Sequence, residues 1–114
     1  MVQIDIIVEN EISSLLINGD VDASSSIQLD DALKKTIDDG AVKIIIGCEN
    51  LNYISSAGLG VFMSYIEDIK TKGIRMALYG LNDKVMNVFE ILGLDQLLNI
   101  VSTKKDAIAS ISEA

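Results

Sequence analysis

The sequence predicts a single α/β domain with a mixed, mostly parallel β-sheet packed against helices, and three observations lead to this fold class. Compact β-branched runs such as residues 42–46 are typical of strands covered on both faces. Segments with aliphatic residues at helical spacing, such as residues 56–72, separate the strands, and such single-helix connections require parallel pairing with right-handed crossovers. A chain of 114 residues without repeats has the length of one domain. Residues 1–114 are therefore expected to form one unit.

The first strands are expected to form an antiparallel pair. Residues 2–8 alternate imperfectly between apolar and polar side chains, which indicates a half-buried strand. A short turn at residues 9–11 leads to a second strand at residues 13–18, which Gly19 should end. The central strand is expected at residues 42–46, before the stretch that carries the serines and glycines.

Glycines and capping residues mark the first two helices. Ser25 and Gln28 have the spacing of a capping box, which predicts that a helix begins at Ser25. Gly40 supplies the left-handed position that closes this helix. The second helix should run over residues 56–72, with Gly73 as its end.

The last third of the chain continues the alternation of strand and helix. The expected elements are a strand at residues 74–79, a helix from Asn82 to Gly93, a docking turn at residues 94–98, a short edge strand at residues 99–101 and a helix from Thr103 with Asp106 in its first turn. The resulting order is β-β-α-β-α-β-α-(β)-α.

Composition narrows the classes of partner. The formal net charge is −8, from 17 acidic and 9 basic residues, which would repel nucleic acid and an anionic membrane surface alike. The residues after Met1 lack the pattern of a signal peptide, and no stretch approaches about 20 apolar residues. We therefore expect a cytoplasmic protein with no direct nucleic-acid or membrane partner. The core should be aliphatic, because aromatic residues make up only 4% of the chain.

The chemistry expected of an enzyme is missing. The sequence has no histidine and one cysteine, Cys48, which excludes Ser-His-Asp and Cys-His nucleophiles and a Cys/His zinc site. Cys48 is expected to be a small buried hydrophobic residue at a strand end. No P-loop is present, and Gly58 with Gly60 lacks the third glycine of a dinucleotide fingerprint. Asp20 and Asp22 are a weak signal for a hard cation. We expect no catalytic residues, no metal and no cofactor.

Residues 52–62, where the central strand gives way to serines and then glycines, suit the acceptor of a phosphate. A serine at a helix start exposes its hydroxyl, and free N–H groups in the first turn favour an anion there. Two glycines in this turn cost roughly 1 kcal/mol each relative to alanine. Either Gly58 and Gly60 allow a partner protein to approach, or they allow close packing of helix on sheet while Ser55 or Ser56 caps the helix.

Two segments carry a resemblance that spans nearly the whole chain. Residues 54–60, Ile-Ser-Ser-Ala-Gly-Leu-Gly, together with residues 19–22, Gly-Asp-Val-Asp, resemble the anti-sigma factor antagonists of the STAS family. The resemblance implies that Ser56 is phosphorylated and that Asp20 and Asp22 help to engage the kinase. The partner-binding residues implied are Asp20, Asp22, Ser55, Ser56, Gly58, Leu59 and Gly60. Two departures are Ser55, where the family has aspartate, and Ala57, where the family has a second hydroxyl residue.

The function that the resemblance implies is a partner switch. The unphosphorylated form would bind an anti-sigma factor that is also a serine kinase and so free a sigma factor, and phosphorylation of Ser56 would release it. A serine phosphatase is a further implied partner, and the free protein is expected to be a monomer. One alternative is a STAS module of a different complex, in lipid transport or another signalling switch. Another is a small hydrolytic or phosphotransfer enzyme that uses Asp20 and Asp22.

Overall fold

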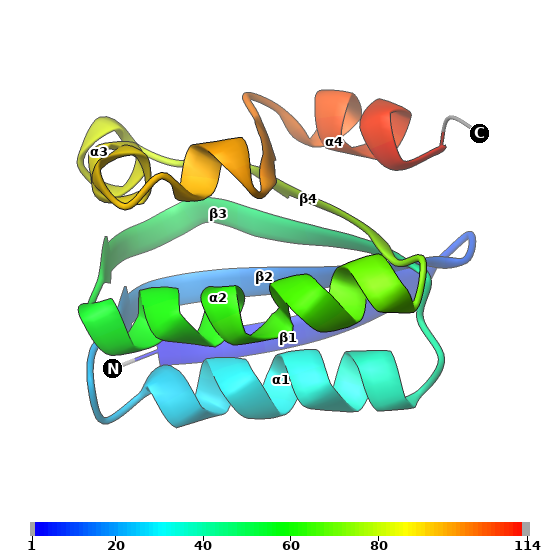
Figure 1. Ribbon diagram of the computed structural model, residues 1–114, viewed down its shortest axis with the longest axis horizontal. Coiled ribbons are helices and arrows are strands. Elements are labelled where there is room, and N and C mark those ends of the chain that lie inside the picture. Colours follow the sequence, from blue (N-terminus) through cyan, green and yellow to red (C-terminus); the bar gives the residue numbers. More distant parts are fainter. Residues whose placement is uncertain (1, 113–114) are drawn as a thin grey trace.

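Five strands form one mixed sheet in the computed structural model, which describes residues 2–112 (Figure 1). The spatial order of the strands equals their order in the sequence. The first two strands pair antiparallel, and every later pair is parallel. The strands are β1 (Val2–Glu9), β2 (Ile12–Val21), β3 (Lys43–Ile54), β4 (Arg75–Tyr79) and β5 (Asn99–Val101). The predicted α/β class and the predicted element order are confirmed.

Helices cover both faces of the sheet, but unequally. The helices are α1 (Ser26–Asp38), α2 (Ser56–Thr71), α3 (Asp83–Ile91) and α4 (Lys104–Ser112), with a short 3-10 helix η1 (Leu94–Gln96) after α3. The larger core joins one face of the sheet to α1, α2, α3 and η1, while the smaller core joins the opposite face to α4. Figure 1 shows α1 and α2 running side by side on the face opposite α4. Among the described residues, no helix is long and apolar enough to cross a membrane.

The alternation of side chains along β3 explains the two cores. Ile44 and Ile46 belong to the larger core and Ile45 to the smaller one, so the strand is covered on both faces. The core is mainly aliphatic, as composition predicts, with one aromatic contact between Phe62 and Phe89 at 5.8 Å between ring centroids. Cys48 is fully buried, and burial raises the pKa of its thiol to about 12.

Turn and capping residues close the elements largely as predicted. Asn10 and Glu11 adopt positive φ values of 52° and 67° in a two-residue turn between β1 and β2. Gly40, at φ 92°, follows α1. The Asn82 side chain accepts the Val85 N–H at 2.8 Å, at the start of α3. Short-range signals thus determine where most elements begin and end.

Two strands are longer than predicted. β2 continues through Gly19 to Val21, and β3 continues past residue 46 to Ile54. The two extensions pair with each other in parallel, Val21 opposite Ile54, after a register shift next to Gly19, whose φ is 106°. The prediction that Gly19 ends the second strand is therefore wrong, because glycine here accommodates a bulge instead of a strand end.

Replacing Phe62 by alanine tests the larger core. Phe62 is fully buried against Phe89, so Phe62→Ala leaves a cavity and is expected to lower the free energy of unfolding by about 3–5 kcal/mol. The control is Ile91→Ala on α3, where the side chain is 72% exposed and the change should be within about 0.5 kcal/mol. Urea unfolding monitored by circular dichroism measures both. Equal effects of the two substitutions would contradict this assignment of the core.

Candidate partner-binding site

The carboxyl ends of β2 and β3 bring the two predicted segments together. Val21 lies opposite Ile54 in the parallel register, and the Ser55 N–H donates a hydrogen bond to the Val21 carbonyl at 2.8 Å. Each strand then leads into a helix, β2 into α1 and β3 into α2. Residues 20–22 and 55–60, separate in the sequence, therefore share one edge of the sheet.

Ser55 is the N-cap of α2. Its backbone is extended, at φ −84° and ψ 171°, and its hydroxyl accepts the Gly58 N–H at 3.2 Å. Its carbonyl accepts the Leu59 N–H at 3.0 Å. Serine and aspartate are both favoured N-caps, so serine at this position keeps the cap without adding a charge.

Ser56, the first residue of α2, is exposed at the same edge. Within residues 2–112 its hydroxyl makes no hydrogen bond, in contrast to the hydroxyl of Ser55. The backbone N–H groups of a helix's first turn lack partners within the helix and carry partial positive charge. A phosphate on Ser56 would therefore lie at a helix terminus that favours an anion.

Asp22 organises the loop between β2 and α1. Its Oδ1 atom accepts the backbone N–H groups of Ser24 at 3.0 Å and Ser25 at 2.9 Å. The hydroxyls of the same two serines donate to Oδ1 at 2.8 Å and 2.9 Å. These bonds, of which that from the Ser24 hydroxyl has the largest effect, lower the pKa of Asp22 from 3.8 to about 2. Asp22 is therefore a carboxylate that holds the loop in place.

The capping box predicted for Ser25 and Gln28 does not form. The Ser25 side chain makes no capping bond to α1. Its hydroxyl instead accepts the Asp22 N–H at 2.9 Å and lies 3.2 Å from the Asp20 carbonyl oxygen. Ser25 is buried, and its hydroxyl forms its hydrogen bonds within the loop. The start of α1 is therefore held by backbone contacts and has no side-chain cap from Ser25.

Asp20 differs from Asp22 in what its carboxylate does. In the part of the chain that the structure describes, the Asp20 carboxylate makes no hydrogen bond, and the residue is half-buried. Asp20 lies opposite Tyr53 in the register of β2 and β3, and Tyr53 is 52% exposed. The sequence does not reveal that Tyr53 belongs to this surface. An aromatic residue next to a strand is usually assigned to the core, and the exposure of Tyr53 follows only from the full length of β3.

The two glycines of α2 have different environments, which separates the two interpretations left open by the sequence. A Cβ atom on Gly58 would lie 2.7 Å from Ile54 Cγ1 and 2.8 Å from Val21 Cγ1, whereas one on Gly60 would meet nothing within 4 Å. Gly58 therefore permits close packing of α2 on the sheet. Leu59 is 1% exposed and belongs to the core. Gly58 and Leu59 thus support the predicted partner-binding surface from beneath, and Gly60 remains on it.

No metal centre is apparent at this edge. In the range from residue 2 to residue 112, no group of three or more Cys, Asp or Glu side chains gathers where a metal ion could be held. The arrangement instead presents the exposed Ser56 hydroxyl at a helix start, and the Asp20 carboxylate and the exposed Tyr53 ring at the paired ends of β2 and β3. Such a surface suits recognition by another protein.

The chain belongs to the STAS domain family. Residues 3–107 match the family model of the STAS domain, which covers nearly the whole chain and confirms the family that the two sequence segments predict.

Named relatives agree with this assignment. An anti-sigma-B factor antagonist of Staphylococcus aureus is 27% identical over 84 residues, which cover 74% of this chain and 78% of that protein. A putative anti-sigma factor antagonist from Thermotoga maritima has the same fold, with a TM-score of 0.89 and 21% identity over 96% of this chain and 95% of that one. The Bacillus cell fate determinant SpoIIAA in its phosphorylated form gives a TM-score of 0.70, with 23% identity over 96% and 97% of the two chains.

Alanine at each glycine of α2 tests their different roles. Gly58→Ala places a methyl group against two β-branched side chains, and this overpacking, about 1–3 kcal/mol, should exceed the gain of about 1 kcal/mol in helix propensity. Gly60→Ala meets open space and should stabilise the protein by up to about 1 kcal/mol. Thermal unfolding measures both. Stabilisation by Gly58→Ala would contradict the close contact with Val21 and Ile54.

The low pKa of Asp22 predicts a pH dependence of its own. Because the pKa is lower in the folded state, the contribution of Asp22 to stability is fully present above about pH 3.8 and is lost as the pH falls towards about 2. An NMR titration of the carboxyl carbon should give a midpoint near 2, and Ser24→Ala should raise it. Ser26→Ala is the control, since the Ser26 hydroxyl donates to the Ala23 carbonyl and leaves Asp22 untouched. A midpoint near 3.8 in the unaltered protein would show that these bonds do not persist.

Proposed function

We propose that this protein is an anti-sigma factor antagonist in a phosphorylation-controlled partner switch. The unmodified protein binds an anti-sigma factor that is also a serine kinase, and a sigma factor is freed. Phosphorylation of Ser56 releases this protein from the anti-sigma factor. The observation that carries this proposal is the exposed Ser56 hydroxyl at the first turn of α2, on the edge shared with residues 20–22. The names of the relatives, antagonists of anti-sigma factors, support it.

Ser56 is a better phosphate acceptor than Ser55 for geometric reasons. The Ser55 hydroxyl accepts the Gly58 N–H, and the Ser55 backbone N–H donates to the Val21 carbonyl. A kinase would therefore have to open the start of α2 to reach the Ser55 hydroxyl. The Ser56 side chain projects from the helix without such bonds among the described residues. Phosphate at Ser56 would also interact favourably with the α2 dipole, so the helix should persist after modification.

The switch acts on binding through charge. A phosphoserine adds about −1.5 to −2 charge at the centre of the proposed contact surface, at the edge of the sheet that also carries Asp20. A partner that accommodates Asp20 and a neutral Ser56 then meets repulsion and must desolvate a dianion. A loss of about 2.8 kcal/mol would weaken binding about a hundredfold. No change of fold is required.

The protein acts in this scheme as a regulator that is modified by others. Asp22, which an enzyme would need as a free carboxylate, has its Oδ1 atom occupied by four donors from Ser24 and Ser25. A serine phosphatase would remove the phosphate and restore binding. The switch operates between proteins in the cytoplasm, without direct contact with DNA.

Charge substitutions on α2 test the proposal. Purified anti-sigma factor kinases of the source organism should bind the unmodified protein in isothermal titration calorimetry. Ser56→Asp should weaken that binding at least tenfold, and Ser56→Ala should bind like the parent. The matched control is Ser64→Asp, which adds the same charge on exposed α2 surface about 12 Å further along the helix. Equal weakening by the two aspartates, or no binding by any such kinase, would refute the proposed switch and favour a STAS module of another complex.

A further inference from the structure

The outer side of β1 is a free edge of the sheet with an unusual apolar character. β1 is the first strand in the sheet order, and within residues 2–112 it pairs only with β2. Ile6, Ile7 and Val8 follow one another on this strand and are 38%, 42% and 67% exposed. Edge strands of soluble proteins are commonly protected by lysine, proline or a bulge, and β1 contains neither residue and pairs with β2 in unbroken register.

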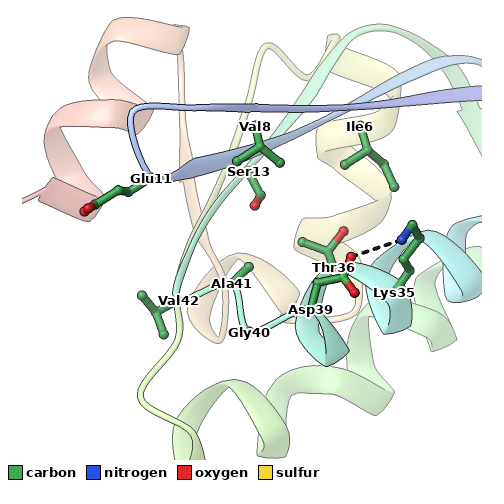
Figure 2. A pocket seen from close by; sticks show the side chains of 10 residues that line it. All are labelled: Ile6, Val8, Glu11, Ser13, Lys35, Thr36, Asp39, Gly40, Ala41 and Val42. Carbon is green, nitrogen blue, oxygen red and sulfur yellow. Dashed lines mark hydrogen bonds and ion pairs between the residues drawn. The ribbon is translucent and has the colours of Figure 1, made fainter.

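A groove beside this edge continues the apolar surface (Figure 2). Ile6 and Val8 point from β1 into a space of about 330 Å³ above the C-terminal end of α1, and Val42, 54% exposed, lines it further along. The polar side of the groove carries Lys35 and Asp39, which are paired with each other at 3.0 Å. Lys35 and Asp39 therefore neutralise each other, and Glu11 at the hairpin adds a further carboxylate to the lining.

The hairpin determines which residues of β1 have backbone groups available at the free edge. The turn has two residues, Asn10 and Glu11, so the flanking pair of Glu9 and Ile12 is the hydrogen-bonded pair that closes the hairpin. Hydrogen-bonded and non-bonded pairs alternate along antiparallel strands. The even-numbered residues of β1 therefore direct their N–H and C=O groups away from β2. They are Val2, Ile4, Ile6 and Val8.

We propose that a second copy of this chain pairs with β1 in antiparallel orientation, with the two-fold axis at Ile6. Ile6 would then lie opposite its own copy, and Ile4 opposite Val8, and both are pairs whose backbone groups face outwards. On the other face Asp5 would meet Ile7, and Gln3 would meet Glu9. One sheet then continues through both copies, and the exposed aliphatic side chains bury one another.

Charge and the length of aligned strand together select this register among the alternatives. Side chains on the same face, and backbone groups that point outwards, pair with each other only if the two-fold axis passes through a residue of β1. The alternative registers are therefore centred on other residues of the strand. An axis at Ile7 would place Asp5 opposite Glu9, and an axis at Asp5 would place this carboxylate opposite its own copy. Like charges directly opposite each other destabilise a strand pair. Registers centred on Ile4 or Val8 also avoid such contacts, but they align only residues 2–6 or residues 7–9 of β1. The register centred on Ile6 aligns residues 3–9 and therefore pairs the most side chains without like charges.

The free edge fits a second copy because it is self-complementary under two-fold symmetry, which is the commonest symmetry of soluble oligomers. Pairing of one strand and its flanking side chains is smaller than a standard interface of about 1,600 Å², and the net charge of −8 on each copy opposes association. The dimer should therefore be weak and strengthened by salt. Ser56 follows β3, which lies two strands away from β1 in the sheet order, so Ser56 takes no part in the strand pairing.

Sedimentation velocity on the full chain from about 5 to about 500 µM tests the pairing. The parent protein should shift from monomer to dimer over this range. Ile6→Lys places two ammonium groups against each other at the axis and should weaken the dimer at least tenfold. Gln3→Lys, opposite Glu9, should tighten it several-fold at low salt. Circular dichroism confirms that each variant is folded.

The control variant is Ile91→Lys, which adds the same side chain at a 72% exposed position on α3 and should dimerise like the parent. A parent protein that stays monomeric at the highest concentration would overturn the proposal. Dimerisation of folded Ile6→Lys at the parent's concentration would also overturn it, as would equal weakening by Ile91→Lys, since either places the contact elsewhere.

Discussion

The junction between the ends of β2 and β3 is the constraint on which the candidate site depends. Val21 takes part in it three times: its carbonyl accepts the Ser55 N–H at 2.8 Å, it lies opposite Ile54 in the sheet, and its side chain borders Gly58. These contacts fix where α2 begins and how closely it approaches the sheet. The position of Ser56 follows from them, because Ser56 is the first residue after this fixed point.

At this junction, residues of the same type have different tasks. Ser55 and Asp22 use their side-chain oxygens within the chain, as the cap of α2 and the centre of the loop before α1. Ser56 and Asp20 present theirs at the same edge without bonds among the described residues. One member of each pair therefore builds the surface and the other is available to a partner. Serine at position 55 fits this division, since it retains the cap of α2 without adding a charge.

The sequence predicts the parts of the fold that depend on short-range signals. Gly40, Asn82 and the turn at Asn10 mark element boundaries through local backbone and capping preferences, and the structure agrees at each. The extension of β3 to Ile54 was not predictable in this way, because it depends on pairing with β2 more than thirty residues earlier. The same limit applies to the site. The motif indicates Ser56 and Asp20, but the burial of Gly58 and the exposure of Tyr53 require the packed sheet.

The most direct test of the account is to map the phosphate after incubation with ATP and the cognate anti-sigma factor kinase. Tandem mass spectrometry of the unaltered chain, Ser55→Ala and Ser56→Ala distinguishes the two neighbouring acceptors. The account predicts phosphate on Ser56 in the first two proteins and none at this stretch in the third. Phosphate on Ser55, or only at positions away from the start of α2, would contradict the central claim that the junction exposes Ser56 for modification.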